Sequence, residues 1–556
     1  MPFCAIRVPR NQPVPGRRAK LAATMAKPRT TQWAQLFALP EHSALPLQGQ
    51  LRQAIVQNIL DRRLGAGEAL PSSRDMALLL GLSRNTVTSA YLQLVDEGFL
   101  QARPRSGVFV AANARAASVE RVEPLPGGRG LAPDWIARVR RSLQDQPTLS
   151  KPQAWSSYPY PFIYGTHDPQ LFPTEDFREC CVRSLARSQL PHWTPDLETD
   201  DVPELIEQIR TRLLPKRGVF ALNEEIIVTV GTQHAYYLLA EALFDPGTRL
   251  GMEEPGHPHA RNSFAMRRPK QLPIAVDAEG LVVDALPALD YLFVTPSHQS
   301  PTTTTLSLAR RQWLLRQAEL QDFVLIEDDY EAENLYQGQP MPALKSLDRA
   351  GRVIYIGSVS KSLSPVLRLG YIVAPRALIR ELRLVRHAMV RHPSAFLQHA
   401  YALFLSLGHH ESHTRRVNQA MQERLTLAAQ ALRDHLPEFR FQLPLGGASI
   451  WVQAPAWVDA AELAAMGRRH GVLVEAGDVF FAKPPYPCPF FRLRLSSIAA
   501  SQIAAGIQAL GLAVNDLAQA RGEKRNRQER AVNRLAAPSV QKVQTGVNTR
   551  NSMPRT

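Results

Sequence analysis

Residues 355–371, YIGSVSKSLSPVLRLGY, decide how the large C-terminal part of this chain folds. Their pattern predicts a short strand over residues 353–357, a serine-rich turn that carries Lys361, and a second apolar run over residues 369–374. A lysine in this setting can form a Schiff base with an aldehyde. The neighbouring hydroxyls and a guanidinium seven residues later can hold a phosphate; these are Ser358, Ser360, Ser362 and Arg368. The alternative is a solvated Ser/Lys turn, and the surrounding chain must decide between the two.

The length of the chain, 556 residues, exceeds what one hydrophobic core supports, so we expect two or more domains. We find no uninterrupted apolar run of about 18 residues, which argues against a membrane span. The N-terminus lacks the apolar stretch of a secretory signal. The four cysteines form no CxxC pair, so we expect free thiols in a reducing cytoplasm and no metal site.

The net charge of +15 is concentrated at the two ends of the chain. Residues 1–46 carry seven Lys or Arg against one acidic residue, and residues 515–556 carry nine against three. Residues 151–514 are almost neutral, with 36 basic and 37 acidic residues. Basic ends favour a polyanionic partner, and the alternative is that they are solvated tails. We interpret residues 1–46 as a basic irregular extension in which order is confined to residues 33–39, and residues 515–556 as a basic disordered tail.

Residues 47–112 carry the pattern of a winged helix-turn-helix. Ser72 with Asp75 three residues later is a helix-starting capping box, and Gly81 ends that helix. Ser83 caps a second helix whose apolar residues follow helical spacing, namely Val87, Ala90, Tyr91 and Leu94. Two helices joined by so short a turn form a helix-turn-helix. Two short apolar runs then flank a basic turn, which predicts a two-stranded wing.

The second of these helices is the expected DNA-reading element. Its first turn presents Arg84, Asn85 and Thr86, which is where a recognition helix meets base edges in the major groove. Arg and Asn can contact a base through two hydrogen bonds, each pair worth roughly 1–3 kcal/mol of discrimination. Arg74 is placed near the DNA backbone, and the predicted wing tip adds Arg103, Arg105, Ser106 and Gly107. The alternative is a small helical packing domain whose charges are merely solvated.

Residues 113–157, rich in Ala, Arg, Pro and Gly, are interpreted as a linker that lets two domains move independently. From residue 158 to 514, short apolar strands alternate with helical stretches, which predicts an α/β domain with a mainly parallel sheet. The expected strands cover residues 226–230, 272–275, 291–294, 323–326, 353–357 and 370–374, with helices at 232–244 and 307–320. Ligands bind such sheets at the carboxyl ends of the strands.

Polar clusters follow several of these strands. Thr232 and Gln233 open a helix, where free N–H groups favour a phosphate, although Thr232 can equally be a plain helix cap. The sequence EDDY ends another strand, so that Asp328 can pair with a pyridinium nitrogen. Tyr330, two residues on, points the same way along an extended chain and can bond a ring hydroxyl. The alternatives for EDDY are a metal-binding acidic cluster and a solvated loop.

The order of these motifs is GTQ, EPGH, SHQSP, EDDY and SxSKx6R, followed by an arginine in a late strand. It resembles the fold-type I aminotransferases that use pyridoxal 5′-phosphate. With the winged helix in front, residues 47–514 resemble a MocR-type (GabR-like) regulator of the GntR superfamily. The resemblance implies a mainly parallel sheet with a smaller C-terminal α+β subdomain, and a homodimer.

The resemblance also implies roles for particular residues. Lys361 would carry the Schiff base, Asp328 would face the pyridine nitrogen, and Tyr330 with His298 would flank the ring hydroxyl. Arg492 would bind a substrate carboxylate, although Arg494 lies on the same side of the predicted strand. The implied phosphate cup consists of Thr232, Gln233, Ser358, Ser360 and Arg368, and Arg74, Arg84, Thr86 and the wing would contact DNA.

Four positions depart from the family pattern. His257 stands where tyrosine is common, and an imidazole can stack on a cofactor ring, more weakly and with pH dependence. His259 stands where some relatives have a ligand-binding arginine. TTTT follows Pro301 where Thr-Gly is frequent, and Arg105 replaces a frequent glycine of the wing. These departures bear on the identity of the ligand and on the shape of the wing tip.

The preferred hypothesis is a cytoplasmic transcriptional regulator that binds operator DNA, holds pyridoxal 5′-phosphate on Lys361 and senses a small amino compound. Its aminotransferase activity would be vestigial at most. A second hypothesis is a working aminotransferase with an accessory DNA module, in which Lys361 also moves a proton. A third keeps DNA binding and supposes a cofactor site without function. The sequence does not give the effector, the operator or the sign of regulation.

Overall fold

The computed structural model describes residues 45–112, 133–140, 146–164, 168–331, 333–336, 341–359 and 363–536, together with a few single residues outside these ranges. Ser360, Lys361 and Ser362 therefore lie outside the described residues. The chain divides into two units, residues 1–140 and 141–556. Among the described helices, none has the length and apolar character needed to cross a membrane.

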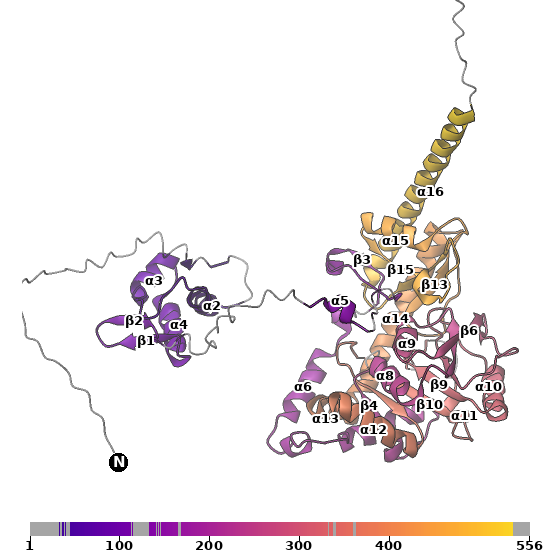
Figure 1. Cartoon of the computed structure of the whole chain (residues 1–556), viewed down its shortest axis with the longest axis horizontal. Coiled ribbons are helices and arrows are strands. Elements are labelled where there is room, and N and C mark those ends of the chain that lie inside the picture. The colour runs from indigo at the N-terminus through magenta and orange to yellow at the C-terminus, as the bar shows by residue number, and fades with distance from the viewer. Residues whose placement is uncertain are drawn as a thin grey trace, which may run out of the picture. The chain divides into compact units, whose positions relative to one another are not determined.

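The first unit is the predicted winged helix. It contains α2 (Leu47–Leu60), α3 (Ser73–Leu80), α4 (Arg84–Asp96), and a hairpin of β1 (Leu100–Arg103) and β2 (Gly107–Val110) (Figure 1). The Ser72 side chain accepts from the N–H of Asp75, and Ser83 caps α4 in the same way. Gly81 ends α3 in the left-handed conformation, with φ of 65°. The four apolar positions predicted on α4 are all buried in the core of the unit.

The core of this unit also uses residues from before Leu47. Trp33 and Phe37 are buried, with their rings stacked at 5.7 Å between centroids. The Asn58 amide donates to the carbonyl of Leu36 at 2.7 Å. The ordered unit therefore begins earlier than the predicted boundary at residue 47, while most of residues 1–46 lie outside the described residues.

The second unit is built on an eight-stranded sheet in the order β4-β11-β10-β9-β8-β5-β6-β7. The strands β10, β9, β8, β5 and β6 are mutually parallel, whereas β11 runs antiparallel to both of its neighbours. A mainly parallel sheet is confirmed. The sequence pattern does not predict β5, because its end is charged. The bounds are β4 (Ile226–Thr229), β5 (Arg249–Glu254), β6 (Lys270–Asp277), β7 (Gly280–Leu281), β8 (Tyr291–Val294), β9 (Val324–Asp329), β10 (Val353–Ser358) and β11 (Gly370–Val373).

Helices cover both faces of this sheet. On one face, α8 (Thr232–Leu243), α9 (Pro258–Ala265) and α12 (Arg376–Val390) share a core with the strands. On the other, α6 (Thr174–Ser184), α7 (Pro203–Gln208) and α13 (Ala395–Ser406) do the same. A third core lies under α10 (Leu308–Gln321) and the short α11 (Leu344–Leu347). Because both faces are buried, the strands read as continuous apolar runs.

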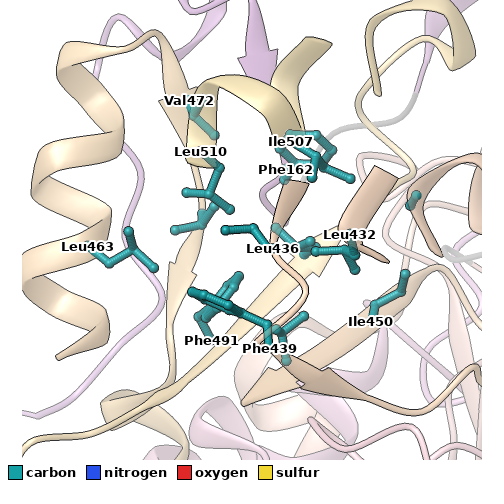
Figure 2. Packing of buried hydrophobic residues seen from close by; sticks show 14 of the residues in the cluster. Phe162, Leu432, Leu436, Phe439, Ile450, Leu463, Val472, Phe491, Ile507 and Leu510 are labelled. Atoms are coloured by element: carbon teal, nitrogen blue, oxygen red, sulfur yellow. The ribbon is translucent and has the colours of Figure 1, made fainter. Parts of the chain in front are cut away.

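A smaller α+β subdomain follows, as the resemblance implied. Its four-stranded sheet has the order β12-β13-β16-β15, with β12 (Arg440–Phe441), β13 (Ser449–Gln453), β15 (Glu475–Ala476) and β16 (Phe490–Arg494). It packs against α14 (His409–His435), α15 (Ala460–Arg469) and α16 (Ala500–Ala536). Phe162 joins this core from the start of the unit, because β3 (Tyr160–Pro161) pairs with β14 (Val472–Leu473) (Figure 2).

The predicted disordered tail is wrong over its first part, because α16 continues through residues 515–536. Leu517 is buried in the core of the subdomain, and Arg521 pairs with Glu462 at 2.9 Å. These contacts stabilise a helix where composition alone indicated solvated charge. Residues 537–556 lie outside the described residues.

The predicted linker also ends earlier than residue 157. The short helix α5 (Trp135–Arg138) exposes its apolar side chains. Beyond it, the amide of Asn262 in α9 donates to the carbonyl of Pro147 at 2.8 Å. The last part of the expected linker, from residue 146, is therefore attached to the second unit.

Candidate functional site

The carboxyl end of β9 brings three predicted site residues together. Asp328 is buried there, and its Oδ2 accepts a hydrogen bond from the hydroxyl of Tyr236 in α8. Tyr330 follows two residues later, also buried, with its ring centroid 6.3 Å from that of His257. The His257 ring lies 5.9 Å from the ring of Tyr236. Asp328, Tyr330 and His257 thus surround one place above the sheet, as a pyridine-ring site requires.

His257 is fixed by the helix that it precedes. It caps α9, and its Nδ1 accepts from the N–H of Ala260 at 3.4 Å. A ring nitrogen that accepts a hydrogen bond carries no proton, so the neutral imidazole is protonated on Nε2. The ring stands close to perpendicular to those of Tyr236 and Tyr330, at 67° and 78°.

Most residues of the predicted phosphate cup lie near the ends of neighbouring strands, while Ser360 lies outside the described residues. Gly231 has φ of 75° and turns the chain from β4 into α8, so that Thr232 is the first helical residue. A Cβ on Gly231 would lie 3.4 Å from Cζ of Arg368, whose Nη2 donates to the carbonyl of Val230 at 3.2 Å. Ser358 is the last residue of β10, which is separated from β4 by β11 in the sheet. A helix N-terminus beside a guanidinium is suited to an anion, so these residues fit a phosphate group; Gln233 is exposed beside them.

His234 is a member of this region that the sequence motifs do not indicate. Its Nδ1 accepts from the N–H of Val230 at 2.9 Å, and its side chain is buried. Burial lowers the pKa of His234 to about 4, and the positive charges of Arg386 and Arg368 act in the same direction. The imidazole is therefore neutral at physiological pH and supports the turn before α8 without adding charge.

Glu253 connects two of the predicted loops, those at residues 254–257 and 297–301. Its carboxylate accepts from the N–H of Thr295 at 3.0 Å, and also from the side-chain amide of Gln299 at 3.1 Å. The same amide donates to the carbonyl of Pro255 at 2.8 Å. Burial raises the pKa of Glu253 to about 7, and its hydrogen bonds oppose that shift. Glu253 and Gln299 thus hold the loop of His257 against the loop of His298.

The contacts of His298 are with other residues than Asp328, Tyr330 and His257. A Cβ on Gly446 would lie 2.7 Å from its Cε1, and the charged groups that act on it include Glu331 and Asp329. The side chain is buried, which lowers its pKa, and its Nδ1 has no hydrogen-bond partner among the described residues. The role of His298 beside a ring hydroxyl stays a prediction.

Arg492 and Arg494, both in β16, differ in how many of their N–H groups donate hydrogen bonds within the protein. Arg494 is bound on several sides, by Glu331 at 2.5 Å and by the hydroxyls of Ser449 and Ser496. Arg492 donates from Nε to Glu475 at 2.7 Å, lies over the Phe480 ring, and keeps a buried Nη2 with no partner among the described residues. The structure therefore favours Arg492 over Arg494 as the residue with donors left for a ligand.

A small cavity joins Arg492 to the ring site. His257 and Tyr330 line it together with Leu149, which belongs to the expected linker, and Tyr164, which follows that linker. The ring of Tyr164 lies 6.1 Å from that of His259. The complete lining among the described residues is Leu149, Tyr164, His257, Pro258, His259, Ser300, Tyr330, Phe480, Arg492 and Arg494.

Two carboxylates of the EDDY stretch, those of Glu327 and Asp329, are bonded to other groups of the protein. Glu327 accepts from the N–H groups of Leu344 and Lys345, both at 2.8 Å. Asp329 accepts from Arg217 at 2.8 Å and from the Tyr355 hydroxyl at 2.9 Å, on the opposite sheet face from Tyr236. Within the described part of the chain, no group of three His, Cys, Asp or Glu could hold a metal ion.

The predicted DNA contacts lie on exposed parts of the first unit. Arg74, Arg84 and Asn85 are exposed, whereas Thr86 is half-buried because its hydroxyl lies 2.8 Å from that of its cap Ser83. On the wing, Arg103 lies 4.4 Å over the ring of Phe109. The remaining wing residues form the tip, where Arg105 and Gly107 have φ of 60° and 107° and Ser106 donates to the carbonyl of Pro104.

A winged helix joined to an aminotransferase-like fold defines a class of regulator, and comparison with known proteins agrees. The family model described as bacterial regulatory proteins, gntR family, matches residues 47–110. The model for aminotransferase class I and II matches residues 195–510, more than half of the chain. These two matches coincide with the winged helix of the first unit and with the sheet and subdomain of the second.

Three relatives each match most of this chain. The HTH-type transcriptional regulator TauR of Rhodobacter capsulatus is 41% identical over 84% of this chain and 96% of its own length. The probable rhizopine catabolism regulatory protein MocR of Rhizobium meliloti is 34% identical, over 73% of this chain and 80% of its own. The pyridoxine biosynthesis transcriptional regulator PdxR of Corynebacterium glutamicum is 30% identical, over 74% and 84%. The chain belongs to this family, the MocR-type transcriptional regulators of the GntR superfamily.

Solved structures resemble the second unit. The α-aminoadipate aminotransferase LysN of Thermus thermophilus, complexed with a phosphopyridoxyl-leucine, is 27% identical over 66% of this chain and 95% of its own, with a TM-score of 0.61. The kynurenine aminotransferase of Pyrococcus horikoshii is 25% identical over 66% and 93%, with the same TM-score. The second unit therefore has the fold of the class I and II aminotransferases, whose members use pyridoxal 5′-phosphate.

Proposed function

We propose that this chain represses or activates transcription from operator DNA in the cytoplasm, holds pyridoxal 5′-phosphate in its second unit, and responds to an amino compound that enters the site. One observation supports this most strongly. Asp328, held by Tyr236, lies in β9, while Gly231 and Thr232 follow β4 and Arg368 precedes β11 of the same sheet. A pyridoxal phosphate site needs a partner for the ring nitrogen and a cradle for the phosphate, and these residues would supply the two.

Each residue has a definite task in that site. When bound, pyridoxal 5′-phosphate supplies an aldehyde that condenses with amines and a ring that withdraws electrons. Lys361 is the amine of the chain that would take the aldehyde, and Asp328 holds the ring nitrogen. Arg368 and the start of α8 hold the phosphate, with Ser358 and Ser360 as further donors. His257 covers one face of the ring, and Tyr330 bonds the ring hydroxyl.

The effector would carry a primary amine and one anionic group. The amine is needed because the aldehyde condenses with amines. The anionic group is inferred from Arg492, whose Nη2 is buried in the cavity wall without a partner among the described residues. Arg494 adds little attraction for a second anion, since Glu331, Ser449 and Ser496 already take its donors.

The winged helix would read DNA through α4. Arg84 and Asn85 face base edges, while Arg74, Arg103 and Arg105 contact phosphates. A homodimer, with two such units, would bind two spaced half-sites. The effector can change this binding only if the protein holds it with different affinity in its two states.

The experiment that tests the proposal is a footprint on DNA upstream of the protein's own gene, with and without pyridoxal 5′-phosphate, for the wild type and Lys361→Ala. We expect two protected half-sites whose protection changes with the cofactor in the wild type only. Equal protection under all conditions would indicate a cofactor site without function. No protection, together with steady turnover of an amino acid and a keto acid, would favour the aminotransferase alternative.

A further inference from the structure

Tyr236 occupies a position in α8 that none of the sequence motifs indicates. Its side chain is buried, with 1% of the residue exposed. Three rings surround it: those of Phe264 and Phe293, both 5.7 Å away, and that of His257 at 5.9 Å. The ring is thereby fixed, and its hydroxyl is directed at a single acceptor, Oδ2 of Asp328.

The hydroxyl donates the hydrogen bond and keeps its proton. Burial, followed by the negative charge of Asp328, raises the pKa of Tyr236 well above its usual value. Asp328 is itself buried, so this bond forms in a medium of low dielectric constant, where it is strong. A hydrogen bond donated to a carboxylate stabilises its charged form and makes it a weaker base.

A pyridine nitrogen that faces such a carboxylate is affected in turn. A carboxylate that carries more negative charge on the oxygen facing the ring stabilises the protonated pyridinium more strongly. A protonated ring withdraws electrons better than a neutral one, and this property is what drives proton removal from a bound amino acid. A donor on the far side of the carboxylate therefore weakens the ring as an electron sink.

We propose that Tyr236 is a positioning residue that fixes the Asp328 carboxylate and, by sharing its charge, reduces protonation of the ring nitrogen of bound pyridoxal 5′-phosphate. This inference rests on the proposed function, because it requires the cofactor to bind with its ring nitrogen at Asp328. It assigns to α8 a second task besides holding the phosphate at its N-terminus.

The test is the ¹⁵N chemical shift of ring-labelled pyridoxal 5′-phosphate bound to the full chain, followed against pH. Tyr236→Phe removes the hydroxyl, and with it the bond donated to Asp328 and the one accepted from the Thr232 side chain. From the loss of the bond to Asp328 we expect the apparent pKa of the ring nitrogen to rise by about one unit, a tenfold shift in protonation. Tyr237→Phe is the matched control, since Tyr237 is the next residue of the same helix and is only half-buried. It should leave the shift unchanged.

A second variant covers the case in which Tyr236→Phe fails to fold. Replacement of Tyr236 by 3-fluorotyrosine keeps the shape and makes the hydroxyl a stronger donor, so the ring-nitrogen pKa should fall. An unchanged ¹⁵N profile in either folded variant, with the cofactor bound as tightly as in the wild type, would overturn the inference. Failure of the wild type to bind the cofactor would instead overturn the proposed function, and with it this inference, so the two failures are distinguishable.

Discussion

Arg492 donates from Nε to Oε2 of Glu475 at 2.7 Å, and both side chains are buried. The other oxygen of Glu475 accepts the main-chain N–H of Tyr164 at 2.7 Å. Glu475 therefore has two tasks: it neutralises Arg492 and it fixes the chain just before the sheet domain. Because Nε is taken, the outer edge of the guanidinium is the part that remains for a ligand.

Replacing Arg492 should weaken the response to amino acids without abolishing cofactor binding. Arg492→Lys keeps the charge but loses the two-pronged geometry, so we expect at least a tenfold weaker response to unbranched amino acids such as β-alanine. The readout is the absorption change of bound pyridoxal 5′-phosphate on titration with the amino acid. The cofactor spectrum before titration should match that of the wild type.

Arg494→Lys is the comparison variant, because Arg494 lies two residues after Arg492 in the same strand, β16. Its donors hold Glu331 and Ser449 in the interior, so breaking them leaves a buried carboxylate poorly paired and should destabilise the chain by about 3 kcal/mol. If Arg494→Lys, once folded, loses the response while Arg492→Lys keeps it, the assignment of the ligand-binding arginine is wrong.

Gly231→Ala should weaken cofactor binding. The residue has φ of 75°, and the added methyl group would lie against the Arg368 guanidinium. We expect at least a tenfold loss of affinity for pyridoxal 5′-phosphate, measured by fluorescence titration, since the phosphate loses a well-placed partner. Gly351→Ala is the control: its φ is 71° and nothing lies within 4 Å of the new methyl group. Both variants carry the backbone penalty of about 1–2 kcal/mol, but only the first should affect the cofactor.

Stability should fall on mild acidification because of His234. Its pKa is about 4 in the folded chain against 6.5 as the ordinary value. As the pH falls below 6.5, the His234 imidazole becomes protonated in the unfolded chain but stays neutral in the folded chain. The free energy of unfolding therefore falls by about 3 kcal/mol by pH 4. Urea denaturation at several pH values checks this. The loss should be smaller in His234→Gln, and an equal loss in both proteins would contradict the assignment.

Arg84 and Arg74 should differ in how they affect DNA binding. Arg84→Ala should cost about 1–3 kcal/mol and relax the preference at one base pair. Arg74→Ala should weaken binding to all sequences alike and reduce the slope of log affinity against log salt by about one. Binding of operator and unrelated DNA over a range of salt concentrations separates the two. The same result for both variants would mean that α4 does not read bases.

Sequence patterns that span a few residues predict the structural elements that depend only on neighbouring residues. Ser72 and Ser83 start helices because their hydroxyls accept the first free N–H groups, a rule that spans only three residues. Asp328 was predicted to follow a strand that ends at residue 326; it lies within the last two residues of β9, at the carboxyl end of a buried parallel strand, where ligands bind such sheets. Such residues can be found from sequence alone.

Contacts between distant segments could not be found in this way. Tyr236 and Asp328 are 92 residues apart, and Glu475 lies 311 residues from Tyr164. Read by itself, each of these residues is an ordinary member of a helix or strand. The helical course of residues 515–536 was missed for the same reason, because Leu517 and Arg521 are held by the subdomain, which the composition of the tail does not reveal.

Asn262→Ala should separate sensing from DNA binding. The variant loses the hydrogen bond from α9 to the Pro147 carbonyl, so the effect of β-alanine on the footprint should shrink while its effect on the cofactor spectrum persists. Asn418→Ala is matched, since Asn418 also donates to a carbonyl, that of Glu333 at 2.9 Å. It should preserve both effects; loss of both in Asn262→Ala would show that the contact serves binding only.

The attachment of Pro147 to α9 has a consequence for the cell. His257 caps the start of the short helix α9, and Asn262 within the same helix holds Pro147, in the last part of the expected linker. If α9 couples effector binding to DNA binding, the coupling free energy belongs to both binding equilibria, and such coupling is reciprocal. If the proposed effector changes the affinity for operator DNA, operator DNA must change the affinity for that effector by the same factor. A regulator seated on its operator would respond to a different concentration of effector than one free in solution.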